Sequence, residues 1–238
     1  MLTFLKQKGV IFETIRYYNK RKNLLWSFIL IKIIKLLCCI TIGYFLGALN
    51  PAALISKIKK KDLRKEGTKN LGATNTMLIF GKACGAIVLV FDLFKGFFAV
   101  KLCSGIFHDI GISGLMAGLG AVLGHIFPFY LKFKGGKGLA PYAGVVLAFD
   151  PVIFLFLLVL CTVLILIINY GVAMPMSAGI LFPILSYIRT GRIEVLICSL
   201  LPSAVIITKH FPNLIKAIKH EDYKVRDVIK NMFSKKSA

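Results

Sequence analysis

Long apolar segments constrain the fold of this chain more than any other feature of its sequence. Hydrophobic residues make up 57% of its 238 residues, more than a soluble domain of this length needs to fill one core. A helix that crosses a bilayer needs roughly 20 mostly apolar residues, because no water inside the membrane can pair with an open backbone. We therefore predict an all-α polytopic membrane helix bundle with about seven transmembrane helices. They are expected near residues 37–58, 83–107, 111–131, 138–150, 151–168, 172–188 and 193–209.

A proline interrupts one of these apolar segments. Residues 138–168 are largely apolar, but Asp150-Pro151 lies between two apolar runs, and proline disfavours helical geometry in the residue before it. We expect a tight helical hairpin at this point. Its first arm, residues 138–150, is too short to cross about 30 Å of hydrocarbon, so we interpret it as a half-helix packed among other helices.

Basic residues set the expected orientation, because short cytoplasmic loops carry an excess of Lys and Arg. The segment 57–69 is strongly basic, and counting spans puts the segment 132–137 and the tail from Lys209 on the same side. We predict a multi-pass protein of the cell membrane whose active face is cytoplasmic. The basic residues of the first segment are Lys57, Lys59, Lys60, Lys61, Arg64, Lys65 and Lys69.

The N-terminal residues disagree with this orientation. Seven spans and a cytoplasmic C-terminus put residues 1–36 outside, yet they contain the basic run 20–22. Two interpretations stay open: residues 10–35 form an interfacial amphipathic helix, or they add a span that returns the basic end to the cytoplasm. The expected domains are a basic N-terminal extension at 1–36, a membrane domain at 37–216 and a basic cytoplasmic tail at 217–238.

The net charge of +21 is one that nucleic-acid-binding proteins often carry. Here the basic residues lie in loops and tails beside apolar segments rather than on a soluble domain. Membrane lipid, anionic lipid head groups and phosphate are therefore the expected partners, and nucleic acid is not. The six cysteines fall within or at the ends of apolar segments without a metal-binding spacing, so we interpret them as reduced packing residues.

Two glycine-bearing stretches concentrate polar residues that suit a phosphate group. Glycine lets backbone N–H groups approach an anion, and nearby Lys, Thr and Asn add donors. Taken alone, either stretch is equally well explained as a turn between helices. Neither carries the nucleotide-binding pattern Gly-x-x-x-x-Gly-Lys-Ser/Thr. The candidate residues are Gly67, Thr68, Asn70, Gly72, Thr74 and Asn75 in the first stretch and Gly135, Gly136, Lys137 and Gly138 in the second.

Further polar residues lie within or beside apolar segments. His210 and Asn213 are three residues apart, so a helix would place both on one face, where they can bind a hydroxyl or phosphate group. Asp92 and Lys95 have the same spacing near the middle of an apolar segment, and a structural ion pair is the preferred interpretation. His125 is more readily explained as a packing or hydrogen-bonding residue than as a catalytic one.

Several short motifs follow one another along residues 37–216. They are 43–47 with Asn50-Pro51, 61–67, 70–75, Gly81-Lys82, 92–96, 124–128, 133–138 and the spacing of His210 and Asn213. In this order they resemble the acyl-phosphate-dependent glycerol-3-phosphate acyltransferase family, an integral membrane group of bacterial phospholipid synthesis. Several motifs in the right order are far more specific than any one of them.

The resemblance implies a seven-helix fold, a cytoplasmic active site without metal or nucleotide, and a defined reaction. A fatty acyl group would move from acyl phosphate to the primary hydroxyl of glycerol 3-phosphate, which gives lysophosphatidic acid and inorganic phosphate. By resemblance, residues 67–75 form one phosphate-binding turn, Lys137 holds the other phosphate, and His210 and Asn213 contact glycerol phosphate; these three are the expected catalytic residues. Because acyl phosphate is already activated, positioning and charge stabilisation can supply much of the rate without a protein nucleophile.

Some residues depart from the family's motifs where polar substrate contacts are expected. Leu78 replaces an arginine, whose guanidinium would contribute about 1.5–3 kcal/mol of phosphate contact. Two interpretations follow: a diverged acyltransferase that uses another basic residue such as Lys69, or a non-catalytic paralogue that binds anionic lipid or phosphate. A transporter is disfavoured, because only Asp92 and Lys95 stand near mid-membrane depth. The other departures are Ala48, Thr68-Lys69, Pro141 and Val172.

Overall fold

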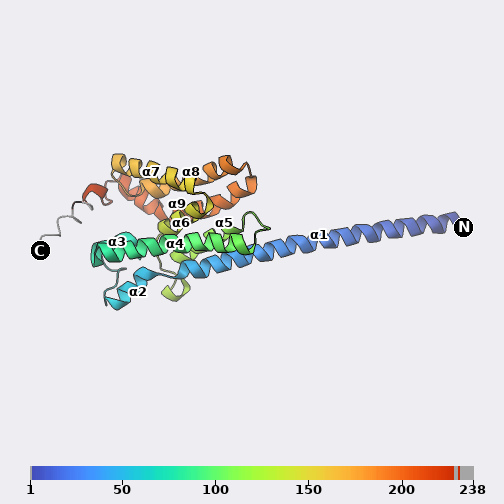
Figure 1. Ribbon diagram of the computed structural model, residues 1–238, viewed down its shortest axis with the longest axis horizontal. Helices are drawn as coiled ribbons and strands as arrows, with labels where there is room; N and C mark the ends of the chain where they lie inside the picture. Colours follow the sequence, from blue (N-terminus) through green and yellow to red (C-terminus); the bar gives the residue numbers. More distant parts are fainter. Residues whose placement is uncertain (1, 228–229, 231–238) are drawn as a thin grey trace. The chain divides into compact units, whose positions relative to one another are not determined.

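The computed structural model describes residues 2–227 and 230, with side chains from residue 20 onward, and the described chain is helical (Figure 1). It contains no β-strand within this range, only an isolated bridge between Tyr170 and Lys224. The predicted all-α class is confirmed, and residues 228–229 and 231–238 of the predicted tail lie outside the described residues. The elements are α1 (Leu2–Ala48), α2 (Pro51–Ile58), α3 (Ala73–Phe80), α4 (Lys82–Ile106), α5 (Ser113–Ile126), the short 3-10 helix η1 (Phe129–Leu131), α6 (Leu139–Phe149), α7 (Pro151–Ile168), α8 (Ala173–Thr190) and α9 (Ile193–Ile218).

Five described segments are long and apolar enough to cross a membrane. Their outward faces are apolar as well: Val152 and Ile167 of α7 expose 69% and 71% of their surface, which suits contact with lipid rather than water. The chain is therefore a multi-pass membrane protein. With 11 residues, α6 spans only about 17 Å and cannot cross alone, and the count of seven helices stays a prediction. The five segments are Lys20–Ile58, Lys82–Ile106, Ser113–Leu131, Pro151–Ile168 and Ile193–Ile218.

The N-terminal helix α1 is continuous from Leu2 to Ala48, so no helix boundary separates the predicted extension from the first span. By its internal contacts the chain divides into two compact units, Met1–Cys38 and Cys39–Ala238. In the first unit, neighbouring apolar side chains such as Leu24, Leu25 and Trp26 are all exposed. An interfacial amphipathic helix needs one strongly polar face. Whether residues 10–35 form an interfacial helix or add a span stays a prediction.

The prediction of one continuous helix over residues 37–58 is wrong in one respect. The helix is interrupted at Leu49-Asn50. Pro51 has no N–H for the helical ladder and disfavours helical geometry in Asn50, whose backbone is extended. The Asn50 side-chain oxygen then accepts a hydrogen bond from Ala53 N at 2.9 Å and begins α2. One predicted helix thus becomes two, and the chain changes direction between them.

The hairpin predicted at Asp150-Pro151 is confirmed. Asp150 Oδ1 accepts hydrogen bonds from the N–H groups of Val152 at 2.8 Å and Ile153 at 3.2 Å, so it caps the first turn of α7. Pro151 occupies the first helical position, where its missing N–H costs nothing. The short helix α6 and the long helix α7 are therefore separate elements.

Small residues bring the helices of the second unit close together. Gly43 and Gly47 of α1 face the backbone of Ala117 and Ala121 in α5, and a Cβ at either glycine would collide with those carbonyl groups. Gly144 of α6 approaches the backbone of α4 in the same way. Lipid tails are as apolar as leucine, so close backbone packing rather than burial from water holds membrane helices together. This packing fixes the positions of α4, α5 and α6, and the second glycine-bearing stretch lies between α5 and α6.

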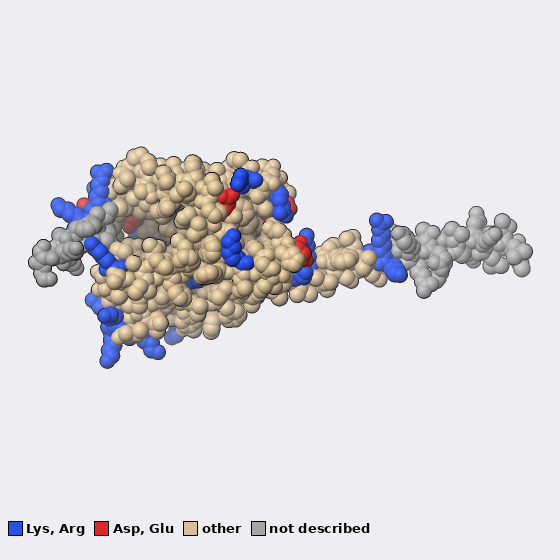
Figure 2. Space-filling model, in the orientation of Figure 1, with Lys and Arg blue, Asp and Glu red and all other residues tan. Residues whose placement is uncertain are grey.

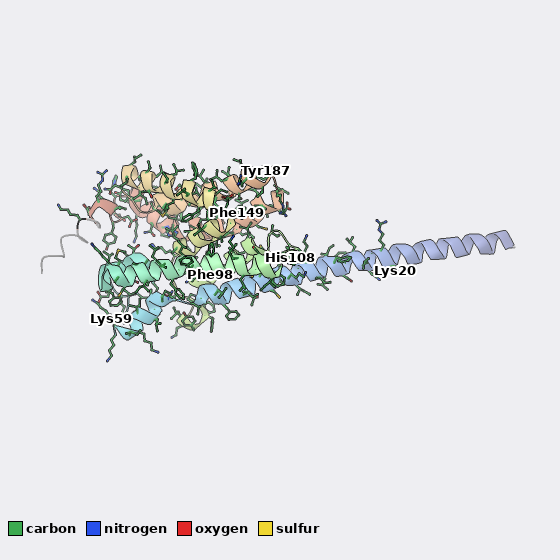
Figure 3. The ribbon with its side chains drawn as sticks, in the orientation of Figure 1. Lys20, Lys59, Phe98, His108, Phe149 and Tyr187 are labelled. Atoms are coloured by element: carbon green, nitrogen blue, oxygen red, sulfur yellow. The ribbon has the colours of Figure 1, made fainter. Side chains whose placement is uncertain are left out.

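Charge is distributed unevenly over the bundle. Lys and Arg side chains gather over the end of the second unit that carries α2 and α3 (Figure 2). Lys59, just after α2, marks this end in Figure 3, whereas His108, just after α4, lies at the opposite end. The basic segment 57–69 and both glycine-bearing stretches belong to the basic end.

Candidate functional site

Asn75 organises the first glycine-bearing stretch from the start of α3. Its side chain is fully buried, and its amide nitrogen lies 2.8 Å from Leu63 O, 3.1 Å from Glu66 O and 3.0 Å from Asn70 O. Its oxygen accepts a hydrogen bond from Thr68 N at 2.8 Å. The polar atoms of Asn75 are thus engaged within the protein, and in this structure the residue shapes the loop.

The other candidates of the first stretch lie nearer the surface. Thr68 and Asn70 are partly exposed, and Thr74 is exposed. Gly72 precedes α3, whose first N–H groups have no intrahelical partners and can face an anion. Gly67 has a φ of +55°, a left-handed backbone conformation that favours glycine. The surface of this loop therefore offers hydroxyl, amide and backbone donors.

The second glycine-bearing stretch folds back on the end of α5. The N–H of Gly135 donates to Ile126 O at 3.0 Å, and the N–H of Gly136 donates to His125 O at 3.1 Å. These amides are paired with the protein, and the glycines serve close packing: a Cβ at Gly136 would collide with His125 Nε2 and approach Leu71 O. Because Leu71 belongs to the first stretch, the two stretches lie in contact although they are far apart in the sequence.

Lys137 and Asn213 meet beside this contact. Lys137 Nζ donates to Asn213 Oδ1 at 2.6 Å, and Asn213 Nδ2 makes a longer contact of 3.4 Å with Asp222 Oδ2. Burial disfavours the ammonium form and holds the pKa of Lys137 below the usual lysine value, although the Asp222 carboxylate acts in the opposite direction. Gly138, with a φ of +87°, lets the chain turn from Lys137 into α6. A cation and an amide from distant parts of the chain are therefore held together.

His210 lies on α9, one turn before Asn213. The helix continues to Ile218, well beyond the predicted end at residue 209, so both residues belong to it. The buried Nδ1 of His210 lies 2.9 Å from Ile206 O and donates to that carbonyl. In the neutral ring Nε2 is then a hydrogen-bond acceptor. Of the three catalytic candidates, the loop before α6 supplies Lys137 and α9 supplies His210 and Asn213.

The ion pair predicted between Asp92 and Lys95 is confirmed within α4. Asp92 Oδ1 and Lys95 Nζ are 2.7 Å apart, and their side chains are only 2% and 3% exposed. Lys95 Nζ also lies 2.8 Å from His125 Nδ1 and donates to Leu49 O at 2.7 Å. His125 is thus part of a buried polar network, and its carbonyl group holds Gly136. The network connects α4, α5 and the break between α1 and α2 to the second glycine-bearing stretch.

The sequence did not predict that the segment after α9 returns to the turn before α8. Asn169 accepts hydrogen bonds from the backbone of the returning segment, and Tyr170 OH lies 3.1 Å from His220 Nδ1. This return brings Asp222 to Asn213. The segment is short and polar and has no hydrophobic periodicity, so its only sequence signal is a group of polar residues directly after an apolar helix.

Three of the residues that depart from the expected motifs lie in packed positions. Ala48, Pro141 and Val172 are buried and bring no polar side chain to the site. Leu78 is partly exposed on α3 and has no hydrogen-bonding group. Lys69 is exposed in the first stretch with a φ of +55°, so the chain places a cation in the loop that leads to α3.

Comparison with known proteins identifies relatives of this chain. A family model described as glycerol-3-phosphate acyltransferase matches residues 37–220. Glycerol-3-phosphate acyltransferases of Macrococcus caseolyticus and Staphylococcus haemolyticus are 37% and 36% identical to this chain, and the matches cover 78% of this chain and 94% and 95% of theirs. The glycerol 3-phosphate form of PlsY (YgiH), an integral membrane glycerol 3-phosphate acyltransferase, is similar with a TM-score of 0.74 at 30% identity, over 79% of this chain and 94% of that one.

A second crystal structure of PlsY, the lysophosphatidic acid form, has a TM-score of 0.73 at 28% identity, over 82% of this chain and 98% of that one. The matched residues 37–220 nearly coincide with the range over which the motifs occur. The resemblance inferred from those motifs is confirmed, and this chain belongs to the glycerol-3-phosphate acyltransferase family.

Proposed function

We propose that this protein transfers a fatty acyl group from acyl phosphate to glycerol 3-phosphate and releases lysophosphatidic acid and inorganic phosphate. The observation that carries the proposal is the 2.6 Å contact between Lys137 and Asn213, beside the place where the two glycine-bearing stretches meet. PlsY has been crystallised in a glycerol 3-phosphate form and a lysophosphatidic acid form, which name the acceptor and the product of this reaction.

The donors around Lys137 suit the acceptor substrate. An ammonium group has three N–H donors, and the contact with Asn213 uses one, so two can bind phosphate oxygens. Low exposure strengthens this attraction, because a charge pair is screened less away from water. His210 Nε2, left as an acceptor, suits a hydroxyl group of glycerol 3-phosphate. In this proposal Lys137 binds the phosphate group while His210 and Asn213 orient the glycerol moiety.

A separate set of residues is proposed to bind the phosphate group of the acyl donor. Thr68, Asn70 and Thr74 present hydroxyl and amide groups near the start of α3, where backbone N–H groups also face outward. The glycines keep both loops thin, so that the phosphate groups and the reacting carbon can approach the loop surfaces closely. The glycine residues with this proposed role are Gly67, Gly72, Gly135, Gly136 and Gly138.

In the proposed reaction the acyl group passes directly between the two substrates, without a covalent bond to the protein. The glycerol 3-phosphate hydroxyl oxygen bonds to the acyl carbon, and the bond from that carbon to the phosphate oxygen breaks. The hydroxyl proton passes to the departing phosphate, which leaves as inorganic phosphate. Phosphate is a good leaving group, so alignment of the two substrates and stabilisation of developing negative charge by Lys137 supply the acceleration. No metal ion or cofactor is required by this scheme.

The membrane supplies the setting for these substrates. An acyl chain prefers hydrocarbon and a phosphate group prefers a basic surface, so the reaction belongs where a basic loop meets the bilayer. The basic segment 57–69 adjoins the proposed site through Leu71. By the excess of Lys and Arg we propose the cell membrane as the location and its cytoplasmic side as the active face.

The proposal is tested with purified protein in lipid nanodiscs. Phosphate released from acyl phosphate is measured with and without glycerol 3-phosphate, and the lipid product is identified by mass spectrometry. We expect release that depends on glycerol 3-phosphate and falls by at least about 100-fold in Asn213→Ala, because an oriented polar contact is lost. Release at the same rate without glycerol 3-phosphate would show hydrolysis instead of transfer.

A non-catalytic paralogue that binds anionic lipid or phosphate is the second candidate. The buried apolar Val172 and the donor-free Leu78, at positions where polar contacts were expected, favour it. It predicts retention of glycerol 3-phosphate or anionic lipid without turnover. The same nanodisc assay separates the two candidates, because turnover by the unmodified chain is compatible only with the enzyme.

A further inference from the structure

A basic cavity lies beside the first glycine-bearing stretch, which contributes Leu71 to its wall. Its volume is about 390 Å³, and four of its lining residues carry positive charge. Lys137, His210 and Asn213 do not line it, so it is distinct from the proposed acyltransfer site. The lining residues are Ala53, Ser56, Lys57, Lys60, Lys61, Asp62, Arg64, Leu71 and Leu131.

Positive charges outnumber negative charges among the residues that line this cavity. Its one carboxylate, Asp62, is held by Arg64, whose Nε lies 3.0 Å from Oδ1 and whose Nη2 lies 3.2 Å from Oδ2. The hydrogen bonds from Arg64 lower the pKa of Asp62, so it stays charged and committed to that partner. Lys61 has a looser contact of 3.6 Å with Glu66. Lys57 and Lys60 are exposed and add two further charges to the wall.

The backbone that carries these lysines is firmly built. Ser56 Oγ donates to Lys61 O and accepts from Leu63 N, at 2.5 Å and 3.2 Å. Leu63 is fully buried and anchors the loop in the bundle. Lys60 has a φ of +52°, which reverses the chain directly after α2. Hydrogen bonds therefore fix the backbone positions of the charged residues around the cavity.

Apolar groups lie next to the charged wall. Leu54 and Ile58 of α2 expose 60% and 67% of their surface, and Leu131 lines the cavity itself. The candidate span that contains α2 ends at Ile58, directly beside the basic residues of the cavity, so a bilayer around this span would bring its head groups close to the cavity. A ligand that combines a phosphate with acyl chains matches both surfaces, whereas a soluble anion matches only one.

We propose that this cavity binds the phosphate head group of an anionic phospholipid, with the lipid's acyl chains against Leu54 and Ile58. Clustered lysines beside a span attract anionic head groups, and each contributes a several-fold change in affinity. Leu71 forms part of the cavity wall, and its carbonyl group faces Gly136 of the second stretch. A bound lipid would therefore contact a residue that itself lies against the second stretch. This binding does not depend on the proposed acyltransfer.

The test compares two pairs of substitutions that remove the same charge. Lys57→Gln with Lys60→Gln alters the cavity wall, whereas Lys59→Gln with Lys65→Gln alters exposed lysines of the same segment that do not line it. Purified protein in neutral detergent is titrated with phosphatidylglycerol or with phosphatidylcholine of the same acyl chains, and bound lipid is counted by native mass spectrometry. No acyl phosphate or glycerol 3-phosphate is present.

We expect phosphatidylglycerol to bind better than phosphatidylcholine and to bind roughly 30-fold more weakly to the cavity pair, from about 5-fold for each lysine. The control pair should lose less than about 5-fold, and Lys137→Ala should bind phosphatidylglycerol as the unmodified protein does. Equal losses in the two pairs, or no preference for phosphatidylglycerol, would overturn the proposal. Displacement of the lipid by millimolar inorganic phosphate would also overturn it, because the site would then serve a soluble anion. Thermal unfolding of each variant checks that the fold is retained.

Discussion

Replacing Lys95 with methionine should destabilise the bundle strongly. Lys95 Nζ lies 2.7 Å from Asp92 Oδ1 and donates to Leu49 O at 2.7 Å, all within segments away from water. Methionine fills most of the same volume but leaves the Asp92 carboxylate without its ammonium partner. Breaking a buried ion pair by removing one member costs about 3–5 kcal/mol. At about 2–4 °C per kcal/mol for a chain of this size, the midpoint of thermal unfolding should fall by roughly 6–20 °C.

The assay is thermal unfolding of the purified protein in detergent, with Lys101→Met as the control. Lys101 is exposed on the same helix, so its removal should change the midpoint by no more than about 2 °C. Changing Lys95 and Asp92 together, to Met and Asn, should restore much of the loss because no unpaired carboxylate is left. A single Lys95 variant that unfolds with the control, or a double variant that is worse by the full sum, would refute this explanation of the network.

Three further predictions follow from the site. Gly136→Ala should lower acyltransfer at least about 10-fold, because its Cβ would displace the His125 ring or Leu71 by about 1 Å and move Lys137. Product formation measures this, and unchanged activity would contradict it. Asn75→Ala should lower the unfolding midpoint by about 2–12 °C, since buried carbonyl groups lose their shared donor at roughly 1–3 kcal/mol in total. An unchanged midpoint would count against its role in the loop. The ammonium form of Lys137 is the form that binds phosphate, and its pKa is lowered. Activity should therefore fall as pH rises through a pKa below that of an ordinary lysine. Activity measured against pH should show this fall at higher pH in Lys137→Arg.

The elements that the sequence predicted correctly have strong local signals. Apolar length identified most helices, and Asp150-Pro151 marked the hairpin because proline and a capping carboxylate act within a few residues. The spacing of Asp92 and Lys95 was enough to predict their ion pair, since three residues on a helix place both on one face. In each case the physical cause lies within one element.

The features that the sequence did not predict depend on contacts between distant elements. Pro51 was a visible signal for the break after α1, but the apolar run through it concealed the break. The attachment of His125 to the Asp92–Lys95 pair depends on how α5 packs against α4, which periodicity does not reveal. The return of Asp222 to Asn213 is likewise a tertiary contact made by a short polar segment.

Asn75 shows the same limit at the level of one side chain. Its place in a glycine-bearing stretch suggested a phosphate ligand, yet the structure surrounds it with backbone groups of its own loop. A polar residue in a turn can serve the ligand or the backbone, and the sequence contains no signal that distinguishes the two. Lys137, which has the same kind of neighbours in sequence, instead contacts a side chain of another helix.

Transfer of the acyl group tests the central claim most directly. Isotope-labelled glycerol 3-phosphate and acyl phosphate are supplied to the protein in nanodiscs, and label in lysophosphatidic acid is counted for the unmodified chain, Lys137→Ala and Lys134→Ala. Lys134 is exposed in the same glycine-bearing stretch and serves as the matched control. We predict labelled product from the unmodified chain and from Lys134→Ala, with a loss of at least about 100-fold in Lys137→Ala. Label incorporated equally by all three proteins, or by none of them, would contradict the assignment of this site.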